Sequence, residues 1–179
     1  EWVDITNQSN IDFFRVNLSA SWSSPSLTLA NANNINITEG LINNTNNGVC
    51  IDASSSSGIT LSGNTFSVCT RALSGTDLGW NFSHNILSGM TENAVELYSN
   101  QSFTIANNTF SNLQKWAIVF GQATTVSQNS ISNACQWTGT WCSAIQNETI
   151  STPNTSFLPA RVTENIIQDV GNGIIWGSY

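Results

Sequence analysis

The segment Phe103-Thr-Ile-Ala-Asn-Asn108-Thr-Phe110 decides the fold, because related segments recur along the chain. Each one alternates apolar and polar residues before an asparagine or glycine, and all but the first place another apolar residue two positions later. Alternation with a period of two is typical of a β-strand with one buried face. The aligned asparagine position is occupied in turn by Asn17, Gly40, Asn64, Asn85, Asn108, Asn129 and Asn165. The position three residues earlier is always apolar and is occupied by Phe14, Ile37, Leu61, Phe82, Ile105, Val126 and Val162.

The length of the repeat indicates a solenoid. Successive aligned positions are 23, 24, 21, 23, 21 and 36 residues apart, and a second short apolar segment, such as Val95–Leu97, follows most of the turns. One unit is too small to bury its own apolar side, whereas stacked units bury their apolar sides together. We therefore predict an all-β fold, a single-stranded right-handed parallel β-helix of about seven coils with 21–24 residues per coil, as one domain over residues 1–179.

The asparagine column predicts both a turn and a ladder. Asparagine and glycine adopt positive φ more easily than other residues, so we interpret the column as a left-handed turn in every coil. Stacking would bring the side-chain amides of successive coils into line, and we expect them to hydrogen-bond along the axis. The long last interval is assigned to loop excursions from the stack over residues 135–158.

These repeats resemble those of the right-handed parallel β-helices of the pectate-lyase-like superfamily. The shared feature is an Asn-x-apolar turn after an apolar-x-apolar strand, and the resemblance covers about residues 11–179. It implies the β-helix fold. It implies no single activity, because that superfamily includes polysaccharide lyases, hydrolases, epimerases, phage spikes, adhesins and surface fibres.

Charged residues are scarce in the 179-residue chain. Lysine and arginine together number 4, aspartate and glutamate 11, and the net charge is −7. So few cations cannot neutralise a run of phosphates, which excludes nucleic acid as a partner. No stretch approaches the roughly 20 apolar residues of a membrane-spanning helix. Small neutral side chains dominate instead, with 25 asparagines, 25 serines and 19 threonines.

The four cysteines, Cys50, Cys69, Cys135 and Cys142, form no CxxC pair, and His84 is the single histidine. We therefore predict no metal site and no cofactor. An even number of cysteines favours disulfides and an extracellular, secreted or cell-surface protein. Cys135 and Cys142 flank a short loop and are paired with each other, which leaves Cys50 with Cys69 by elimination. Two buried free thiols beside one disulfide are the alternative.

Nine Asn-x-Ser/Thr sequons point to N-glycosylation. We expect N-linked glycans on outward or loop asparagines, namely Asn36, Asn81, Asn100, Asn147 and Asn154. Asn17 also lies in a sequon, but we expect it to be unmodified because its amide is assigned to the inside of the turn column. Glycans on the outward faces would block the lateral addition of strands.

A catalytic site is not evident in the sequence. Polysaccharide-cleaving β-helices need paired carboxylates, or an acidic cluster with a basic residue beside it. The acidic residues here are scattered, and Glu39 and His84 share a column but are separated by a coil, at about 10 Å. We interpret His84 as a solvent-facing residue and predict no catalytic residue.

The remaining polar candidates are assigned to the surface. Arg71 and Lys115 are interpreted as exposed loop charges, and Glu92 and Glu96, which bracket a strand, as part of a solvated face. Weak binding of one cation by the two glutamates is the alternative. Two tryptophans in the short cysteine loop, Trp137 and Trp141, are candidates for stacking contacts with carbohydrate.

No amphipathic helix is predicted to cover either end of the stack. We therefore expect either a fragment of a longer β-helix or a protomer capped end to end by copies of itself or by adjoining β-helix coils, which would form a filament. The leading function is a non-catalytic extracellular glycosylated β-helix with a structural role, as a surface fibre, sheath or adhesin segment. The alternatives are a polysaccharide-degrading lyase or glycoside hydrolase whose site is incomplete in this chain, and a carbohydrate-binding or viral spike module.

Overall fold

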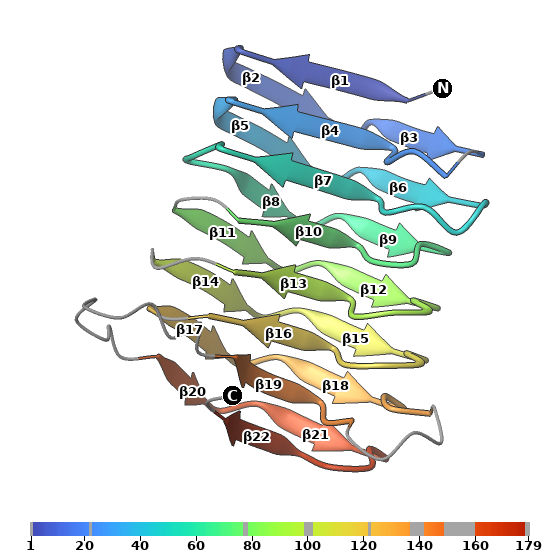
Figure 1. Ribbon diagram of the computed structural model, residues 1–179, viewed down its shortest axis with the longest axis vertical. Coiled ribbons are helices and arrows are strands. Elements are labelled where there is room, and N and C mark those ends of the chain that lie inside the picture. The colour runs from blue at the N-terminus through green and yellow to red at the C-terminus, as the bar shows by residue number, and fades with distance from the viewer. Residues whose placement is uncertain are drawn as a thin grey trace.

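The computed structural model describes residues 2–21, 23–76, 79–98, 102–121, 123–136, 142–148 and 160–177. These ranges contain β-strands and no helix. Each coil contributes one strand to each of three parallel sheets, so equivalent strands of successive coils lie side by side in an extended stack (Figure 1). The predicted all-β parallel β-helix with about seven coils is confirmed.

The three sheets are labelled A, B and C in the order in which their first strands, β1, β2 and β3, occur in the chain. Sheet A contains β1 (Val3–Thr6), β4 (Leu27–Ala30), β7 (Ile51–Ser54), β10 (Leu73–Gly75), β13 (Val95–Leu97), β16 (Ile118–Phe120), β19 (Ile145–Glu148) and β22 (Ile174–Gly177). Sheet B contains β2 (Ser9–Phe14), β5 (Asn33–Thr38), β8 (Thr60–Ser62), β11 (Trp80–Ser83), β14 (Phe103–Ala106), β17 (Thr124–Ser127) and β20 (Arg161–Thr163). Sheet C contains β3 (Asn17–Ala20), β6 (Leu41–Asn44), β9 (Thr65–Ser67), β12 (Ile86–Ser88), β15 (Thr109–Ser111), β18 (Ser130–Ser132) and β21 (Ile166–Gln168).

The core fills the space between the three sheets with columns of apolar side chains. In sheet B, Leu61, Phe82 and Ile105 occupy one register position in successive coils and are fully buried. Burying a large apolar side chain contributes about 1.5–3 kcal/mol, so these columns are the main favourable term in folding.

The buried asparagines form a continuous ladder along the stack. The Nδ2 atom of Asn85 donates to Leu61 O at 2.9 Å and to Asn108 Oδ1 at 3.0 Å, and that Oδ1 also accepts the Asn85 backbone N–H at 2.8 Å. The other ladder asparagines repeat these bonds, and Asn165 is the last acceptor. Burial of an amide is tolerated when its donors and acceptors are used. Each asparagine therefore ties its coil to both neighbours.

The ladder ends at a glycine on its N-terminal side. The Gly40 N–H donates to Asn64 Oδ1 at 2.8 Å, and a Cβ on Gly40 would lie only 3.0 Å from that oxygen. Gly40 thus donates the last bond of the ladder through its backbone N–H and has no side-chain amide to offer to the coil before it. The absence of a side chain leaves room for the Asn64 amide.

The positive φ angle expected in the ladder column lies one residue earlier. In each coil the residue with positive φ precedes the ladder position, and these residues are Arg15, Glu39, Gly63, His84, Asn107, Gln128 and Glu164. The prediction that the ladder asparagines themselves occupy left-handed turns is therefore wrong. Asparagine is required at these positions because its buried amide bonds to groups of three other residues, as that of Asn85 does to Leu61, Asn64 and Asn108, and not because of its backbone conformation.

The first coil departs from the predicted alignment by one residue. Asn17 pairs with Leu41 and not with Gly40, so its side chain is exposed and lies outside the ladder. Phe14 is 60% exposed, and Phe13 packs against the core in its place. Because Phe13 and Phe14 are both apolar, hydropathy does not distinguish the two registers. The assignments of Asn17 and Phe14 to inward columns are corrected accordingly.

Part of the predicted loop excursion over residues 135–158 belongs to the stack. Strand β19 pairs in parallel with β16 on one side and with β22 on the other. An apolar inward position, Ile145, continues the column that contains Ile118. The excursion is therefore interrupted by a regular rung, and residues 137–141 and 149–159 lie outside the described residues.

We predict that Asn85→Ala destabilises the fold by about 3 kcal/mol, because buried donors and acceptors in two coils lose their partner. Asn81→Ala is the matched control. Asn81 lies on the same strand, β11, but is exposed, and we expect a change within about 0.5 kcal/mol. Urea unfolding followed by circular dichroism measures both values. Equal midpoints for the two variants would show that the ladder contributes nothing specific.

Candidate functional site

The outward face of sheet C is free of charge along all of its strands. Its two outward columns are made of Asn17, Leu41, Thr65, Ile86, Thr109, Ser130 and Ile166, and of Ser19, Asn43, Ser67, Ser88, Ser111, Ser132 and Gln168. The face presents hydroxyls, amides and isolated aliphatic side chains at the regular spacing of the strands. Such a face can donate and accept hydrogen bonds but cannot form ion pairs.

Sheets A and B present different electrostatic surfaces. One outward column of sheet A runs through Asp4, Thr28, Asp52, Ser74 and Glu96, with a carboxylate in every second coil. The central outward column of sheet B is charged only at its two ends, by Asp12 and Arg161. Acidic charge on the described strands is therefore concentrated on sheet A.

Four charged residues, Arg71, Glu92, Glu96 and Lys115, meet beside sheet A and are called here the ion-pair cluster. Glu92 lies between two cations, with Oε2 at 2.8 Å from Arg71 Nη2 and Oε1 at 3.1 Å from Lys115 Nζ. Arg71 Nε lies 2.8 Å from Glu96 Oε2, which also accepts a hydrogen bond from Asn93 Nδ2 at 2.8 Å. The cluster contains two positive and two negative groups and is neutral as a whole.

The ion-pair cluster corrects the interpretation of Arg71 and Lys115 as exposed loop charges and of Glu92 and Glu96 as a solvated face. Arg71 and Glu92 are 21 residues apart, and Glu92 and Lys115 are 23 apart, which are the intervals of the repeat itself. Stacking therefore places the three side chains in successive coils. The Glu96 side chain is only 15% exposed. The repeat spacing of opposite charges in the loops was the signal that could have revealed the cluster.

The residues that resemble an acid–base pair are not brought together. Glu39 forms an ion pair with Arg15, at 2.8 Å between Oε2 and Nε. His84 is exposed at a turn with φ of 58°, and the coil containing Gly63 separates it from Glu39. No carboxylate adjoins His84 among the described contacts of its turn column.

The described sequons differ in the placement of their asparagines. Asn36 and Asn81 are exposed on the outward face of sheet B, as expected of glycan carriers. Asn147 is only 8% exposed, and its Nδ2 donates to Gly121 O at 3.1 Å, so its assignment as an outward carrier is corrected. Asn17 is exposed, which removes the reason for expecting it to be unmodified. Asn100 and Asn154 lie outside the described residues.

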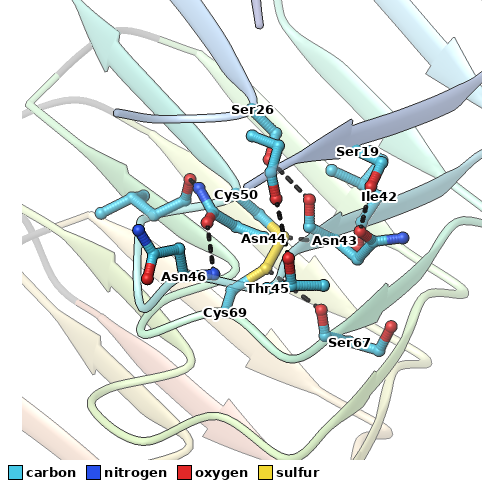
Figure 2. Close-up of a disulfide and its surroundings, with 12 residues drawn as sticks. Ser19, Ser26, Ile42, Asn43, Asn44, Thr45, Asn46, Cys50, Ser67 and Cys69 are labelled. Carbon is cyan, nitrogen blue, oxygen red and sulfur yellow. Dashed lines mark hydrogen bonds between the residues drawn. A yellow bond between two sulfur atoms is a disulfide. The ribbon is translucent and has the colours of Figure 1, made fainter. Parts of the chain in front are cut away.

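Both disulfides are present, Cys50–Cys69 and Cys135–Cys142. The first is buried beneath the loop that connects β6 with β7, and Ser26, Asn43 and Asn44 surround it (Figure 2). Asn44 shapes this loop, since its Nδ2 donates to Ser24 O at 2.7 Å and its Oδ1 accepts the Asn46 N–H at 3.2 Å.

Two further observations concern the described part of the chain. Nowhere in it do three residues among His, Cys, Asp and Glu gather closely enough to hold a metal ion. No helix in it has the length and apolarity that crossing a bilayer requires. The candidate carbohydrate contacts Trp137 and Trp141 lie outside this part, so their placement stays a prediction.

The stacked sheets and the internal amide ladder define a parallel β-helix solenoid stabilised by disulfides. The chain belongs to the NosD family, whose model, described as periplasmic copper-binding protein (NosD), matches residues 3–169. Among solved structures it is similar to the DFA-IIIase from Arthrobacter chlorophenolicus A6, crystallised without its lid. The TM-score is 0.73 and the identity 14%, over 98% of this chain and 48% of that one, so this chain spans about half the length of that protein. A comparison with curated proteins finds no match.

We predict that Glu92→Gln lowers the free energy of unfolding by about 1 kcal/mol, because the half-exposed carboxylate pairs with cations in the coils before and after it. The difference from the parent protein should shrink in 1 M salt, where the screening length is about 3 Å. Glu164→Gln is the control, since Glu164 is exposed and accepts from Gln128 Nε2 at 2.9 Å without an ion pair among its described contacts. A salt-independent difference would argue against ion pairing as the cause.

Proposed function

We propose that this chain is a non-catalytic structural segment of an exported β-helix protein, serving as part of a surface fibre, sheath or adhesin. One observation carries the proposal: Glu92 and Glu96, two carboxylates that the stack brings to the same cation, both form ion pairs with Arg71. Glycoside hydrolysis needs one carboxyl group as an acid and another as a nucleophile or base. In this chain the carboxylates of Glu92 and Glu96 are both engaged in ion pairs with Arg71.

The chemistry of the outward faces supports a structural role. Hydroxyl and amide groups keep their hydrogen bonds over a wide pH range, whereas bonds that depend on ionised carboxylates are lost in acid. The amide ladder and the outward columns of sheets B and C consist mainly of such neutral groups. The disulfides indicate an oxidising compartment, and the family to which the chain belongs is described as periplasmic.

N-linked glycosylation is part of the proposal where the sequon asparagine faces solvent. Asn36, Asn81 and Asn17 meet this condition, because each is exposed on a strand that faces outward. Glycans on Asn36 and Asn81 would cover sheet B. Asn100 and Asn154 remain expected carriers on sequence grounds alone.

The partners that we propose are further β-helix coils at the two ends of the stack. Strands β1, β2 and β3 are the terminal strands of their sheets at one end, and β22, β20 and β21 at the other. A terminal strand has backbone groups that can pair with another strand. Adjoining coils, from the same protein or from another copy, would continue all three sheets.

Binding of a neutral polysaccharide is the second candidate function, and the uncharged face of sheet C favours it. Its hydroxyl and amide groups lie in straight rows, one per coil. Leu41 and Ile86 add aliphatic patches that are 40% and 52% exposed. Neutral sugars are recognised by the same combination of hydrogen bonds and apolar contact, whereas an acidic polymer would gain no ion pair here.

Copper binding, the property named in the family description, is not part of the proposed function. The chain has one histidine, one methionine and four cysteines, and all four cysteines are in disulfides. Met90 is fully buried, and no three residues among His, Cys, Asp and Glu gather closely enough to hold a metal ion in the described part of the chain. The described residues, with all four cysteines in disulfides, do not make a copper site.

Incubation with acidic and neutral polysaccharides tests the absence of catalysis. We expect no new reducing ends and no unsaturated products from either class, because the carboxylates of the ion-pair cluster are neutralised. The double variant Glu92→Gln/Glu96→Gln is the control for contaminating enzymes. Product formation that disappears in this variant would overturn the proposal and assign catalysis to the cluster.

Cosedimentation with insoluble polysaccharides tests the second candidate. We expect the protein to pellet with a neutral polymer if sheet C binds it, and Ser88→Asp/Ser111→Asp to weaken the affinity by about tenfold, as for a loss of about 1.4 kcal/mol. Thr104→Asp/Thr125→Asp is the matched control on sheet B. Equal losses in the two variants would count against sheet C as the binding face.

A further inference from the structure

The apolar side chains of the first coil are less buried than those of the second. Strands β1, β2 and β3 form this first coil (Figure 1). Val3 and Phe13 pack only partly against the core, whereas Leu27 and Ile37, which continue their columns in the second coil, are fully buried. The second coil is covered by the first, and among the described strands none covers the first. The first coil therefore retains apolar surface that a further strand can bury.

A cavity of about 360 Å³ lies at this end of the stack, between the start of β1 and strand β3. It is lined by Val3, Asn17, Leu18 and Ser19. Val3 and Leu18 belong to inward columns of sheets A and C, so they give the cavity an apolar wall. Asn17 and Ser19 belong to the outward columns of sheet C, which are uncharged. Cavities of this size accommodate ligands in other proteins.

The backbone of β3 offers hydrogen-bonding groups beside this cavity. The Leu41 N–H donates to Val16 O at 2.8 Å. The Thr45 N–H donates to Ala20 O at 2.9 Å in the same way, so the even-numbered residues of this segment face β6. Backbone groups of successive residues in a strand point to opposite edges, and β3 is the terminal strand of sheet C. The backbone groups of Asn17 therefore face the open edge of the sheet.

We infer that the edge of β3 binds an extended peptide segment of a partner chain, in which one apolar side chain is flanked by small neutral ones. The segment adds to sheet C as a strand parallel to β3. Its backbone pairs with Asn17, and its apolar side chain fills the cavity against Leu18 and Val3. The inference rests on the proposed function, in which further β-strands adjoin the ends of the stack.

Sheet C itself shows which sequence fits this edge. Its strands β9, β12 and β18 read Thr-Phe-Ser, Ile-Leu-Ser and Ser-Ile-Ser. In each of them the middle side chain points inward and is fully buried, as Phe66 is in β9. A partner strand of the same pattern continues both the inward column that contains Leu18 and the neutral outward columns. An acidic or basic segment would gain no ion pair on this sheet.

Fluorescence anisotropy of a labelled peptide tests the inference directly. The probe is Ser-Gly-Asn-Thr-Phe-Ser, the sequence of residues 62–67, with a fluorophore at its N-terminus. We expect saturable binding with one peptide per chain. The control peptide carries serine in place of phenylalanine and keeps every other residue. It should bind at least about tenfold more weakly, because the cavity then buries no large apolar side chain.

Two variants at one position separate the backbone from the side chain. Asn17→Pro removes the N–H at the open edge and should weaken binding at least about tenfold, whereas Asn17→Ala keeps this N–H and should bind like the parent protein. Circular dichroism checks that each variant retains the β-helix. Val3→Asp, which places a charge in the cavity, tests the same site independently and should also weaken binding about tenfold.

Several results would overturn the inference. They are the absence of binding to the parent protein, equal affinities for the two peptides, and equal affinities of Asn17→Pro and Asn17→Ala. A dimer in sedimentation that excludes the peptide would assign the edge to a second copy of this chain instead. None of these results bears on the absence of catalysis, which the incubation with polysaccharides tests separately.

Discussion

A coil of this protein cannot complete its own hydrogen bonds. Every strand of the β-helix depends on the coil before it and the coil after it, and the buried asparagines impose this dependence most strictly. An amide in the apolar interior is costly unless its groups are all bonded, and here the partners of Asn85 lie in both neighbouring coils. The ladder thus fixes the register of the stack. The apolar columns, the ion-pair cluster and the pairing of Cys50 with Cys69 all follow from that register.

The repeat was predictable because the ladder demands a single residue type. Nothing but asparagine offers a donor and an acceptor of this size in the required geometry, so its spacing stands out in a sequence with 25 asparagines. The first coil was misaligned for the opposite reason. Phe13 and Phe14 satisfy hydropathy equally well, and Asn17 lies close enough to the expected position to be taken for a ladder residue. The positive φ of Arg15 distinguishes the two alignments, but it belongs to a residue that gives no such signal in the sequence.

The surface features were harder to predict than the core, since they depend on where loops lie after stacking. Opposite charges at repeat intervals, as in Arg71 and Glu92, become neighbours only when the loops are aligned as well as the strands. The expectation for Asn147 was wrong in the opposite sense, because a residue expected to be exposed is buried. Its sequon suggests an exposed residue, yet strand β19 turns its side chain inward beneath Gly121. A sequon shows only that an asparagine lies in the sequence required for N-glycosylation. Whether its side chain faces solvent depends on which of the two alternating sides of the strand the residue occupies.

The unequal distribution of charge among the three sheets gives the stack a directional electric field across its axis. Asp4 and Asp52 on sheet A have no cation among the described ion pairs, while sheet C is neutral throughout its described strands. Close to a charged surface, a rod of this kind experiences a torque about its long axis that falls off within a Debye length, about 8 Å at physiological ionic strength. A positively charged support would therefore draw sheet A toward itself. The molecule therefore has a preferred face for adsorption, in addition to an axis along which further coils can stack.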